Sequence, residues 1–271
     1  MELRRIVVAT DASAAGRAAV RTGLDLAARA SARLTVVRVV PLESMPLSGE
    51  RLREWIEPEL ADYPGVQVEL AIASGLPGIE ICRFAERRGA DLLVLGRKRR
   101  SAMARLLAGD TAEAVIRRSR VPCLFVEQDS LPLAHLLVAL DGSDRGMRVY
   151  AATRDFSDAV DAALTVVTVE EQNAPRLADD VPPLPLSRSS RLRRELAPRG
   201  GREAAVATPE VGVAVRQGPV VPEVLAEVSA SGADVLAFGN HRGGPSGILE
   251  AGGTARHLLH AAPVSVLAVP L

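Results

Sequence analysis

The chain has 271 residues, of which 48% are hydrophobic and 24% charged, enough apolar material for one large domain or two of ordinary size. Its 33 basic and 33 acidic residues balance, which excludes a strong overall field for nucleic acid or a membrane surface. The two cysteines are too few for a disulfide framework, and no apolar stretch reaches the ~20 residues that span a bilayer. The chain begins as a strand without a signal-type apolar segment, so we expect a cytoplasmic protein.

Short runs of Val, Ile and Leu recur along the first half and alternate with segments of helical spacing at residues 13–30 and 76–89. The runs lack the alternation of half-exposed strands, so they are typical of strands buried on both faces of a sheet. The strands predicted in this half are Ile6–Val8, Leu34–Val40, Val66–Ile72, Leu92–Leu95 and Cys123–Val126.

The second half repeats the first. RRIVVATDAS matches AHLLVALDGS, GADLLVLG matches GADVLAFG, and SRVPCLFV resembles AAPVSVLAV, in the same order. These matches predict two domains, 1–128 and 134–271. Residues 171–186 are rich in Pro and acids and are predicted to be a loop, followed by a helix at 187–197. The strands predicted in this half are Leu136–Leu140, Leu164–Val169, Val211–Val215, Val235–Phe238 and Val264–Val269.

The alternation of strands and helices predicts an α/β fold made of two repeated, open, doubly wound parallel five-stranded sheets. We expect an approximate two-fold axis between them. In such sheets a ligand binds beyond the carboxyl ends of the strands, where the strand order reverses. The loops at that place hold Asp11 and Gly96 in one half and Asp141 and Gly239 in the other. A carboxylate there can accept from an amino or hydroxyl group, and a Gly-rich turn into a helix can offer N–H groups to phosphate.

Each copy resembles a universal stress protein domain over nearly its whole length. The resemblance rests on VATDAS and VALDGS after the first strand, ASGLPG after the third, and the GADLLVLG and GADVLAFG segments. It implies a Rossmann-like fold of the adenine nucleotide alpha hydrolase type, with the two copies packed as an internal pseudo-dimer. In nucleotide-binding members, G-x2-G-x9-G-[S/T] after the fourth strand holds the phosphates and ribose of ATP, and the Asp after the first strand meets the adenine end.

The first copy departs from that pattern. Arg99 stands in place of the second Gly, and Asp110 replaces the Ser or Thr. Asp110 and Glu113 resemble a capping box, so the Asp110 carboxylate would take the free helix donors and repel a phosphate by roughly 4 kcal/mol. The basic run 97–100 is expected to point to water. The positions that the first copy keeps are Asp11, Gly96, Gly109 and Thr111.

The second copy has Arg242 in place of the second Gly and Gly253 in place of the Ser or Thr. Arg242 could bind a phosphate or be a solvated loop residue, and both readings stay open. Gly253 leaves the N–H groups of the helix available, so the second half is the better candidate for ATP or another adenine nucleotide. The positions that the second copy keeps are Asp141, Gly239, Gly252 and Thr254.

Other chemistry finds less support in the sequence. Ser13 and Ser143 are predicted to be helix N-caps, and no catalytic residues are assigned. His257 and His260, with His241 in the preceding loop, could hold a metal, but no Cys or acidic cluster completes the set and no metal is expected.

We therefore expect a non-enzymatic stress-response protein that holds an adenine nucleotide and binds neither nucleic acid nor membrane. Its protein partner is not identified by the sequence. The alternative is a partner-binding scaffold that has lost nucleotide binding in both halves. A nucleotide-hydrolysing enzyme is the third and least supported reading, because no dedicated general base or acidic pair for Mg²⁺ is evident.

Overall fold

The computed structural model describes residues 2–41, 49–97, 111–127, 131–170, 211–240 and 253–271. In these residues ten strands form one continuous sheet in the order β3-β2-β1-β4-β5-β10-β9-β6-β7-β8. The strands of the first half are β1 (Arg5–Ala9), β2 (Arg33–Val40), β3 (Val68–Ser74), β4 (Leu92–Gly96) and β5 (Cys123–Val126). Those of the second are β6 (His135–Ala139), β7 (Ala163–Glu170), β8 (Gly212–Gln217), β9 (Val235–Asn240) and β10 (Ser265–Pro270).

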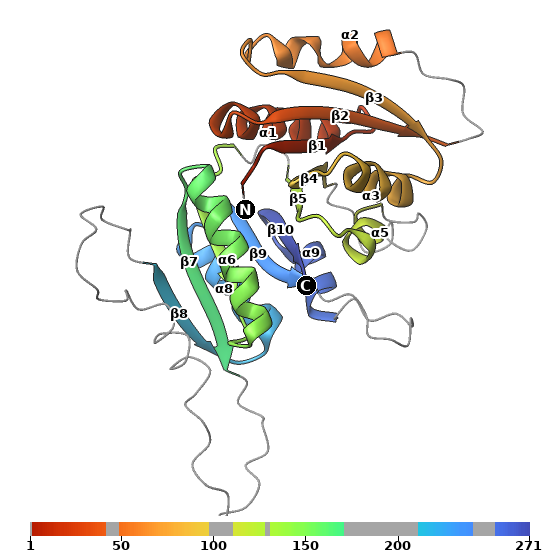
Figure 1. The fold of residues 1–271 in the computed structure, drawn as a ribbon. Helices are drawn as coiled ribbons and strands as arrows, with labels where there is room; N and C mark the ends of the chain where they lie inside the picture. The colour runs from red at the N-terminus through yellow and green to blue at the C-terminus, as the bar shows by residue number, and fades with distance from the viewer. Residues whose placement is uncertain (1, 42–48, 98–110, 128–130, 171–210, 241–252) are drawn as a thin grey trace, which may run out of the picture.

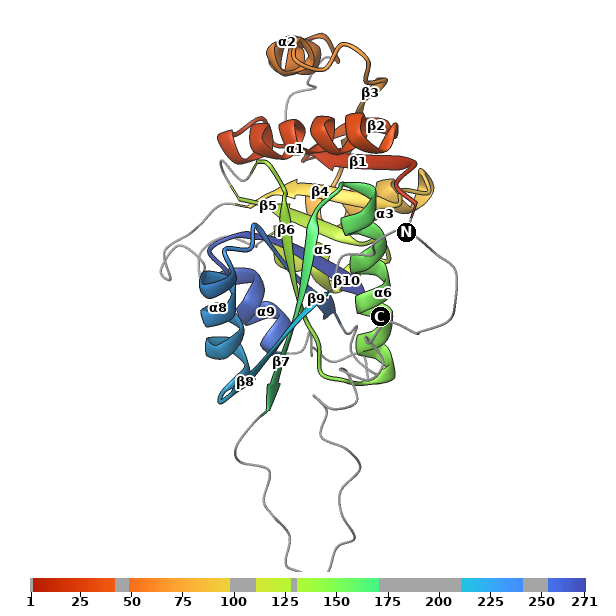
Figure 2. The ribbon, with the colours of Figure 1, turned by 90° about the vertical axis from the view of Figure 1, so that its left-hand side faces the viewer.

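Helices cover both faces of this sheet (Figures 1 and 2). One buried cluster joins alternate strand residues to α1, α2 and α6, and the other joins the intervening residues to α3, α5, α8 and α9. Side chains of the central strands β1, β4, β5, β6, β9 and β10 are mostly buried on both faces, as their unbroken apolar runs predict. The edge strands β3 and β8, predicted in the same way, are instead only partly buried, because each has one neighbouring strand. The described helices are α1 (Ala14–Ala30), α2 (Gly49–Leu60), α3 (Pro77–Arg87), α5 (Thr111–Arg118), α6 (Asp144–Ala159), α8 (Val220–Ser231) and α9 (Gly253–Ala261).

The two halves have one topology. Every strand pair inside a half is parallel, and the first half runs β3-β2-β1-β4-β5 while the second runs β8-β7-β6-β9-β10. The α/β prediction with two repeated parallel units is therefore confirmed. The units meet through β5 and β10, which pair antiparallel and merge them into a single sheet. This edge-to-edge joint is not evident from the sequence.

The turn after the first strand of each half, residues 11–13 and 141–143, is called the Asp turn here and is stabilised by its own side chains. Ser13 caps α1 by accepting a hydrogen bond from the N–H of Gly16 at 3.2 Å, and Ser143 caps α6 in the same way at 3.0 Å. The predicted N-caps are thus confirmed. The middle residue of the turn has a positive φ in both halves, 60° at Ala12 and 72° at Gly142. Glycine adopts that conformation without strain, whereas alanine does not.

The Asp of each repeated Gly-Ala-Asp segment has a structural role. Asp91 accepts hydrogen bonds from the backbone N–H groups of Arg4 and Arg5 at 2.9 and 2.8 Å. Asp234 accepts from those of Ala134 and His135 at 3.0 and 2.9 Å. Each carboxylate ties the beginning of the first strand of its half to the beginning of the fourth. The repetition of this motif therefore reflects sheet assembly.

Helix α2 is attached to α1 by two arginines that pair with the buried carboxylate of Glu59. Glu59 is 3% exposed; it accepts from Arg17 at 2.8 Å and also from Arg21. Burial alone would raise the pKa of Glu59, but the hydrogen bonds from Arg21 and Arg17 outweigh burial and hold the pKa below its ordinary value of 4.5. The Arg17 guanidinium also lies 4.8 Å from the centre of the Trp55 ring.

Candidate functional site

A cavity of about 300 Å³ lies at the carboxyl ends of the strands in the second half. Its lining includes Asp141 from the turn after β6, Gly239 from the end of β9 and Thr254 from the first turn of α9. In this half the order of the strands reverses between β6 and β9, the place where open α/β sheets bind ligands. The structure therefore brings together three residues that the sequence singles out.

The walls of this cavity are mainly apolar. Strand β7, helix α8 and helix α9 each contribute aliphatic side chains, and β9 contributes an aromatic ring. Among the described residues that line it, Asp141 is the one with a charged side chain. An apolar slot with one fixed polar group suits a flat ring that carries a hydrogen-bond donor. The main apolar residues are Val167, Val169, Val220, Val224, Phe238 and Leu258.

The Asp141 carboxylate is fixed by its own turn. Its Oδ1 accepts from the Ser143 N–H at 3.0 Å and from the Ser143 hydroxyl at 2.7 Å. In the first half Asp11 accepts from the same two groups of Ser13, with the N–H at 3.0 Å. Both carboxylates are therefore held in the same way at equivalent ends of β1 and β6. Asp11 and Asp141 are both exposed.

The two glycines that end β4 and β9 differ in their surroundings. A Cβ added to Gly96 would lie 2.1 Å from the carbonyl oxygen of Ala15, so only glycine allows α1 to approach so closely. A Cβ added to Gly239 would meet side-chain methyl groups of Val149 and Leu271, each at 2.8 Å. Backbone is packed on Gly96, whereas side chains are packed on Gly239.

The phosphate loops themselves are only partly described. Thr111 begins α5 and Gly253 begins α9. Among the described residues, a Cβ added to Gly253 would meet nothing within 4 Å. Arg99, Gly109 and Asp110 of the first copy lie outside the described residues, as do Arg242 and Gly252 of the second. The self-capping expected of Asp110 stays a prediction.

The structure corrects one expectation about the first copy. Arg97, which was expected to point to water with its basic neighbours, is buried, and its guanidinium binds carbonyl oxygens of the second half. The Glu113 side chain lies 3.2 Å from Arg256 and 4.0 Å from His260. Its capping box with Asp110 stays a prediction, because Asp110 lies outside the described residues. Both side chains contact the other half, because α5 and α9 lie close to the joint between the two units.

Metal and thiol chemistry gain no support in the described part of the chain. No group of three or more His, Cys, Asp or Glu is placed there to hold a metal, and His241 lies outside it. Burial raises the pKa of Cys82 to about 11 and that of Cys123 to about 12. Both thiols therefore stay protonated at neutral pH and are poor nucleophiles.

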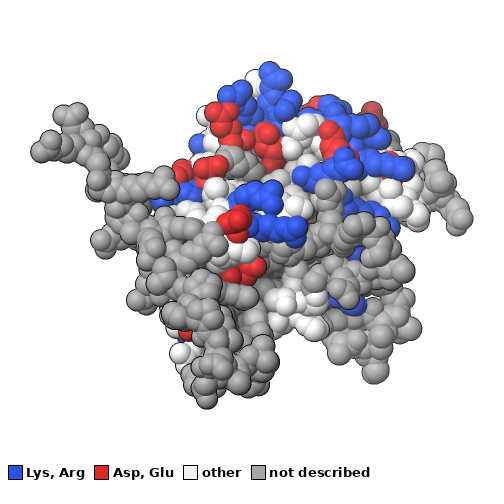
Figure 3. Space-filling model, turned by 60° about the horizontal axis from the view of Figure 1, so that its bottom comes forward, with Lys and Arg blue, Asp and Glu red and all other residues white. Residues whose placement is uncertain are grey.

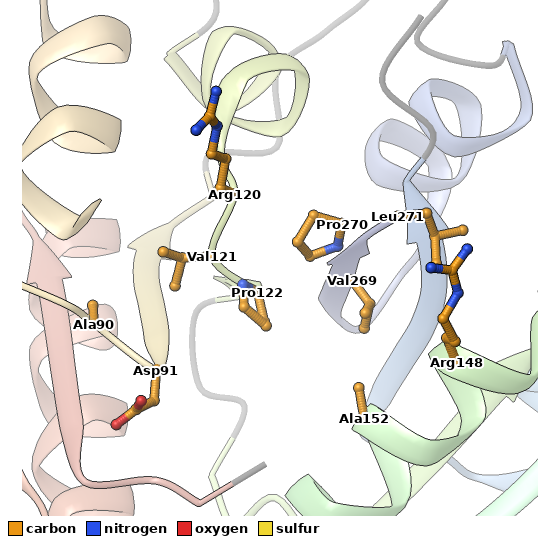
Figure 4. Close-up of a pocket in the computed structure, with 10 residues that line it drawn as sticks. All are labelled: Ala90, Asp91, Arg120, Val121, Pro122, Arg148, Ala152, Val269, Pro270 and Leu271. Carbon is orange, nitrogen blue, oxygen red and sulfur yellow. The ribbon is translucent and has the colours of Figure 1, made fainter. Parts of the chain in front are cut away.

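A second cavity, of about 450 Å³, lies between the halves where β5 begins and β10 ends (Figure 4). Arg120 and Arg148 stand on its opposite walls, and both are exposed. Arg120 lies 4.0 Å from Glu86, and the carboxylate of Asp91 already accepts two backbone N–H groups. Because both arginines are exposed and Asp91 is engaged in the sheet, this cavity is a weaker candidate than the one beside Asp141.

On the face shown in Figure 3, basic and acidic side chains are interspersed over the described residues. Such a mixed surface lacks the one-signed field that steers nucleic acid. The described part of the chain also contains no helix that is long and apolar enough to cross a membrane.

The fold and the two Asp turns define a duplicated α/β protein with a cavity at its strand-order switch point. The family model for the universal stress protein family matches residues 2–127 and 133–270, and this chain belongs to that family. A universal stress protein of Methanocaldococcus jannaschii is 29% identical over 140 residues, which cover 46% of this chain and 82% of that protein.

A solved structure shows the same fold over the whole chain. A universal stress protein from Archaeoglobus fulgidus is similar over 100% of this chain and 99% of its own, with a TM-score of 0.75 and 19% identity, and this likeness shows the fold. A universal stress protein solved in complex with cAMP is 27% identical; the match covers 48% of this chain and 100% of that one, with a TM-score of 0.42.

Proposed function

We propose that this chain is a tandem stress-response protein that holds an adenine nucleotide in its second half. The observation that carries the proposal is the meeting of Asp141, Gly239 and Thr254 around one apolar cavity. The family resemblance assigns Asp141 to the adenine end and Gly239 and Thr254 to the phosphate side.

The proposed roles follow from the chemistry of the lining. Apolar walls from β7 and α8 take the flat faces of the base, since burying such a ring removes apolar area from water. The Asp141 carboxylate accepts from an amino or hydroxyl group of the nucleoside. The first turn of α9, at Gly253 and Thr254, presents N–H groups and the positive end of the helix dipole to phosphate.

Isothermal titration of the full chain with ATP, ADP, AMP, cAMP and adenosine tests this proposal; cAMP is included because one solved family member holds it. We expect one nucleotide per chain. Gly253→Asp serves as the phosphate-side variant, because no described residue lies within 4 Å of a Cβ at this position and the added charge repels phosphate. ATP binding should weaken by about tenfold and adenosine binding should stay unchanged. No heat and no thermal stabilisation with any of these ligands would refute nucleotide binding.

We also propose that the bound nucleotide is not turned over. Asp141 is the charged side chain in the described lining, and it is held by donors from Ser143 instead of facing a nucleophile. Phosphate release from ATP with Mg²⁺ should equal that of buffer alone. A release rate that disappears in Asp141→Asn would support the enzyme reading instead.

A partner-binding scaffold remains the second candidate. Ile72 on β3 and Leu76 before α3 are large hydrophobic residues of the described chain that are 37% and 69% exposed. The two residues lie four positions apart in the sequence, and contiguous exposed apolar side chains are typical of protein contacts. A null titration, combined with a partner whose binding is lost in Leu76→Asp, would favour this candidate.

A further inference from the structure

Arg97 joins the first half to the helix that lines the cavity of the second half. It follows Gly96 directly at the end of β4, and its side chain is only 7% exposed. The guanidinium donates to the carbonyl oxygens of Ala262 and Val264 at 2.8 and 2.7 Å and also to that of Leu259. Glu127 lies 3.6 Å away and balances part of the charge.

Two of these acceptors, Leu259 and Ala262, lie at the C-terminal end of α9, and Val264 lies in the turn between α9 and β10. The last carbonyl groups of a helix lack partners within it and carry the negative end of its dipole, so a buried guanidinium is well matched to them. The same helix lines the cavity with Thr254, Ala255 and Leu258. Leu259, whose carbonyl Arg97 binds, adjoins Leu258. The cavity residues of α9 therefore all lie within about two helical turns of the carbonyl groups that Arg97 binds.

The reciprocal contact is weaker. Asn240 follows Gly239 as Arg97 follows Gly96, and its side-chain N–H donates to the carbonyl oxygen of Ile116 at the corresponding place in α5. For Asn240 one such carbonyl contact across the joint is seen, against three for Arg97. Among the described residues, Arg97 of the first half therefore makes more hydrogen bonds to the cavity helix α9 and the turn after it than Asn240 of the second half makes to α5.

We propose that Arg97 is a positioning residue for the second-half cavity, so that ligand affinity in one repeat depends on a side chain of the other. This inference rests on the proposed function. It gives the first half a role even where its own phosphate loop departs from the family pattern.

The matched variants are Arg97→Met, Arg97→Lys and Arg29→Met. Arg29 is the control because its guanidinium also donates across the joint to a helix-terminal carbonyl, that of Val160, at 2.9 Å. Val160 ends α6, whose sixteen residues span roughly 24 Å, and the cavity residues of α6 are at the opposite end. All variants are made in the full chain carrying Asp11→Asn, so that the titration reports on the second half.

Two measurements are made on each variant: the Kd of ATP and of adenosine by calorimetry, and amide hydrogen exchange of residues 253–261. Arg97→Met should weaken both ligands by about tenfold and speed exchange in α9, and Arg97→Lys should restore part of each. Arg29→Met should lower stability while Kd stays within about twofold. If Arg97 had a purely structural role, Arg97→Met and Arg29→Met variants that lose the same stability would show the same change in Kd.

Unchanged affinity with unchanged α9 exchange in Arg97→Met would overturn the proposal. If the parent chain binds none of the ligands, the proposed function fails, and hydrogen exchange alone decides the positioning role. Faster exchange in α9 for Arg97→Met and not for Arg29→Met would support the role, and equal exchange would refute it.

Discussion

Leu124 of β5 lies directly opposite Leu267 of β10 in the antiparallel ladder, and each residue is the counterpart of the other in the repeat. The two neighbouring pairs, Phe125 with Val266 and Cys123 with Ala268, are likewise equivalent to each other in the repeat. An approximate two-fold axis therefore passes through the Leu124–Leu267 pair, as the duplication predicts. Both leucines are fully buried, so the joint belongs to the core of the whole molecule.

Weakening this joint should destabilise both halves together. Leu124→Ala and Leu267→Ala should each lower the free energy of unfolding by about 3 kcal/mol, because each leaves a cavity in packed surroundings. In guanidinium titrations, Trp55 fluorescence, which reports on the first half, and far-UV circular dichroism should show one shared transition. An earlier, separate transition of Trp55 would show that the halves unfold independently.

The Asp turn offers a matched pair of backbone tests. Ala12 and Gly142 occupy equivalent positions with φ of 60° and 72°. Ala12→Gly should raise the free energy of unfolding by about 0.5–1 kcal/mol, because relief of left-handed strain exceeds the added entropy of the unfolded chain. Gly142→Ala should lower it by about 1 kcal/mol. Denaturant titrations measure both, and a loss of stability in Ala12→Gly would contradict the reading of this turn.

The Glu59 ion pair gives a prediction about pH. The pKa of Glu59 is below 4.5 in the folded state, so its stabilising contribution is present above pH 4.5 and is lost as the pH falls through the folded-state pKa. Glu59→Gln should lower the free energy of unfolding at neutral pH by about 1–2 kcal/mol, a modest loss because both arginines are partly exposed.

Below pH 4.5 the difference between the parent and Glu59→Gln should shrink. Urea titrations from pH 7 to pH 3 measure it, and Glu57→Gln, an exposed glutamate on the same helix, is the control. Parallel curves for the parent and Glu59→Gln across this range would show that the ion pair does not stabilise the fold.

Local patterns in the sequence predict local structure well. The apolar runs give the strands, and Ser13 and Ser143 cap the helices as expected, because these features depend on neighbouring residues. Strand β3 begins at Val68 instead of Val66, since the N–H of Val66 bonds to the carbonyl of Tyr63 in the preceding turn. Helix α2 is not predicted from the sequence, since Pro58 lies inside it.

Contacts between the halves are harder to predict. Arg97 stands in a basic run that suggests a solvated loop, and its acceptors lie 162 to 167 residues further along the chain. Nothing near Arg97 in the sequence indicates that β5 and β10 will place α9 beside it. The meeting of Asp141 and Gly239 is predictable because the strand order alone determines it. The sequence does not predict that Leu271 lines the same cavity, since its position depends on how β10 ends.

In the proposed function, Asp141 holds the adenine end of a nucleotide bound in the second half. The most direct test is calorimetric titration of ATP into the parent, Asp141→Asn and Asp11→Asn. Asparagine keeps an oxygen for the turn hydrogen bonds to the following serine and removes only the charge. We predict one ATP per chain, roughly tenfold weaker binding in Asp141→Asn and unchanged binding in Asp11→Asn. Weaker binding in Asp11→Asn with no effect of Asp141→Asn would contradict the account and place the nucleotide in the first half.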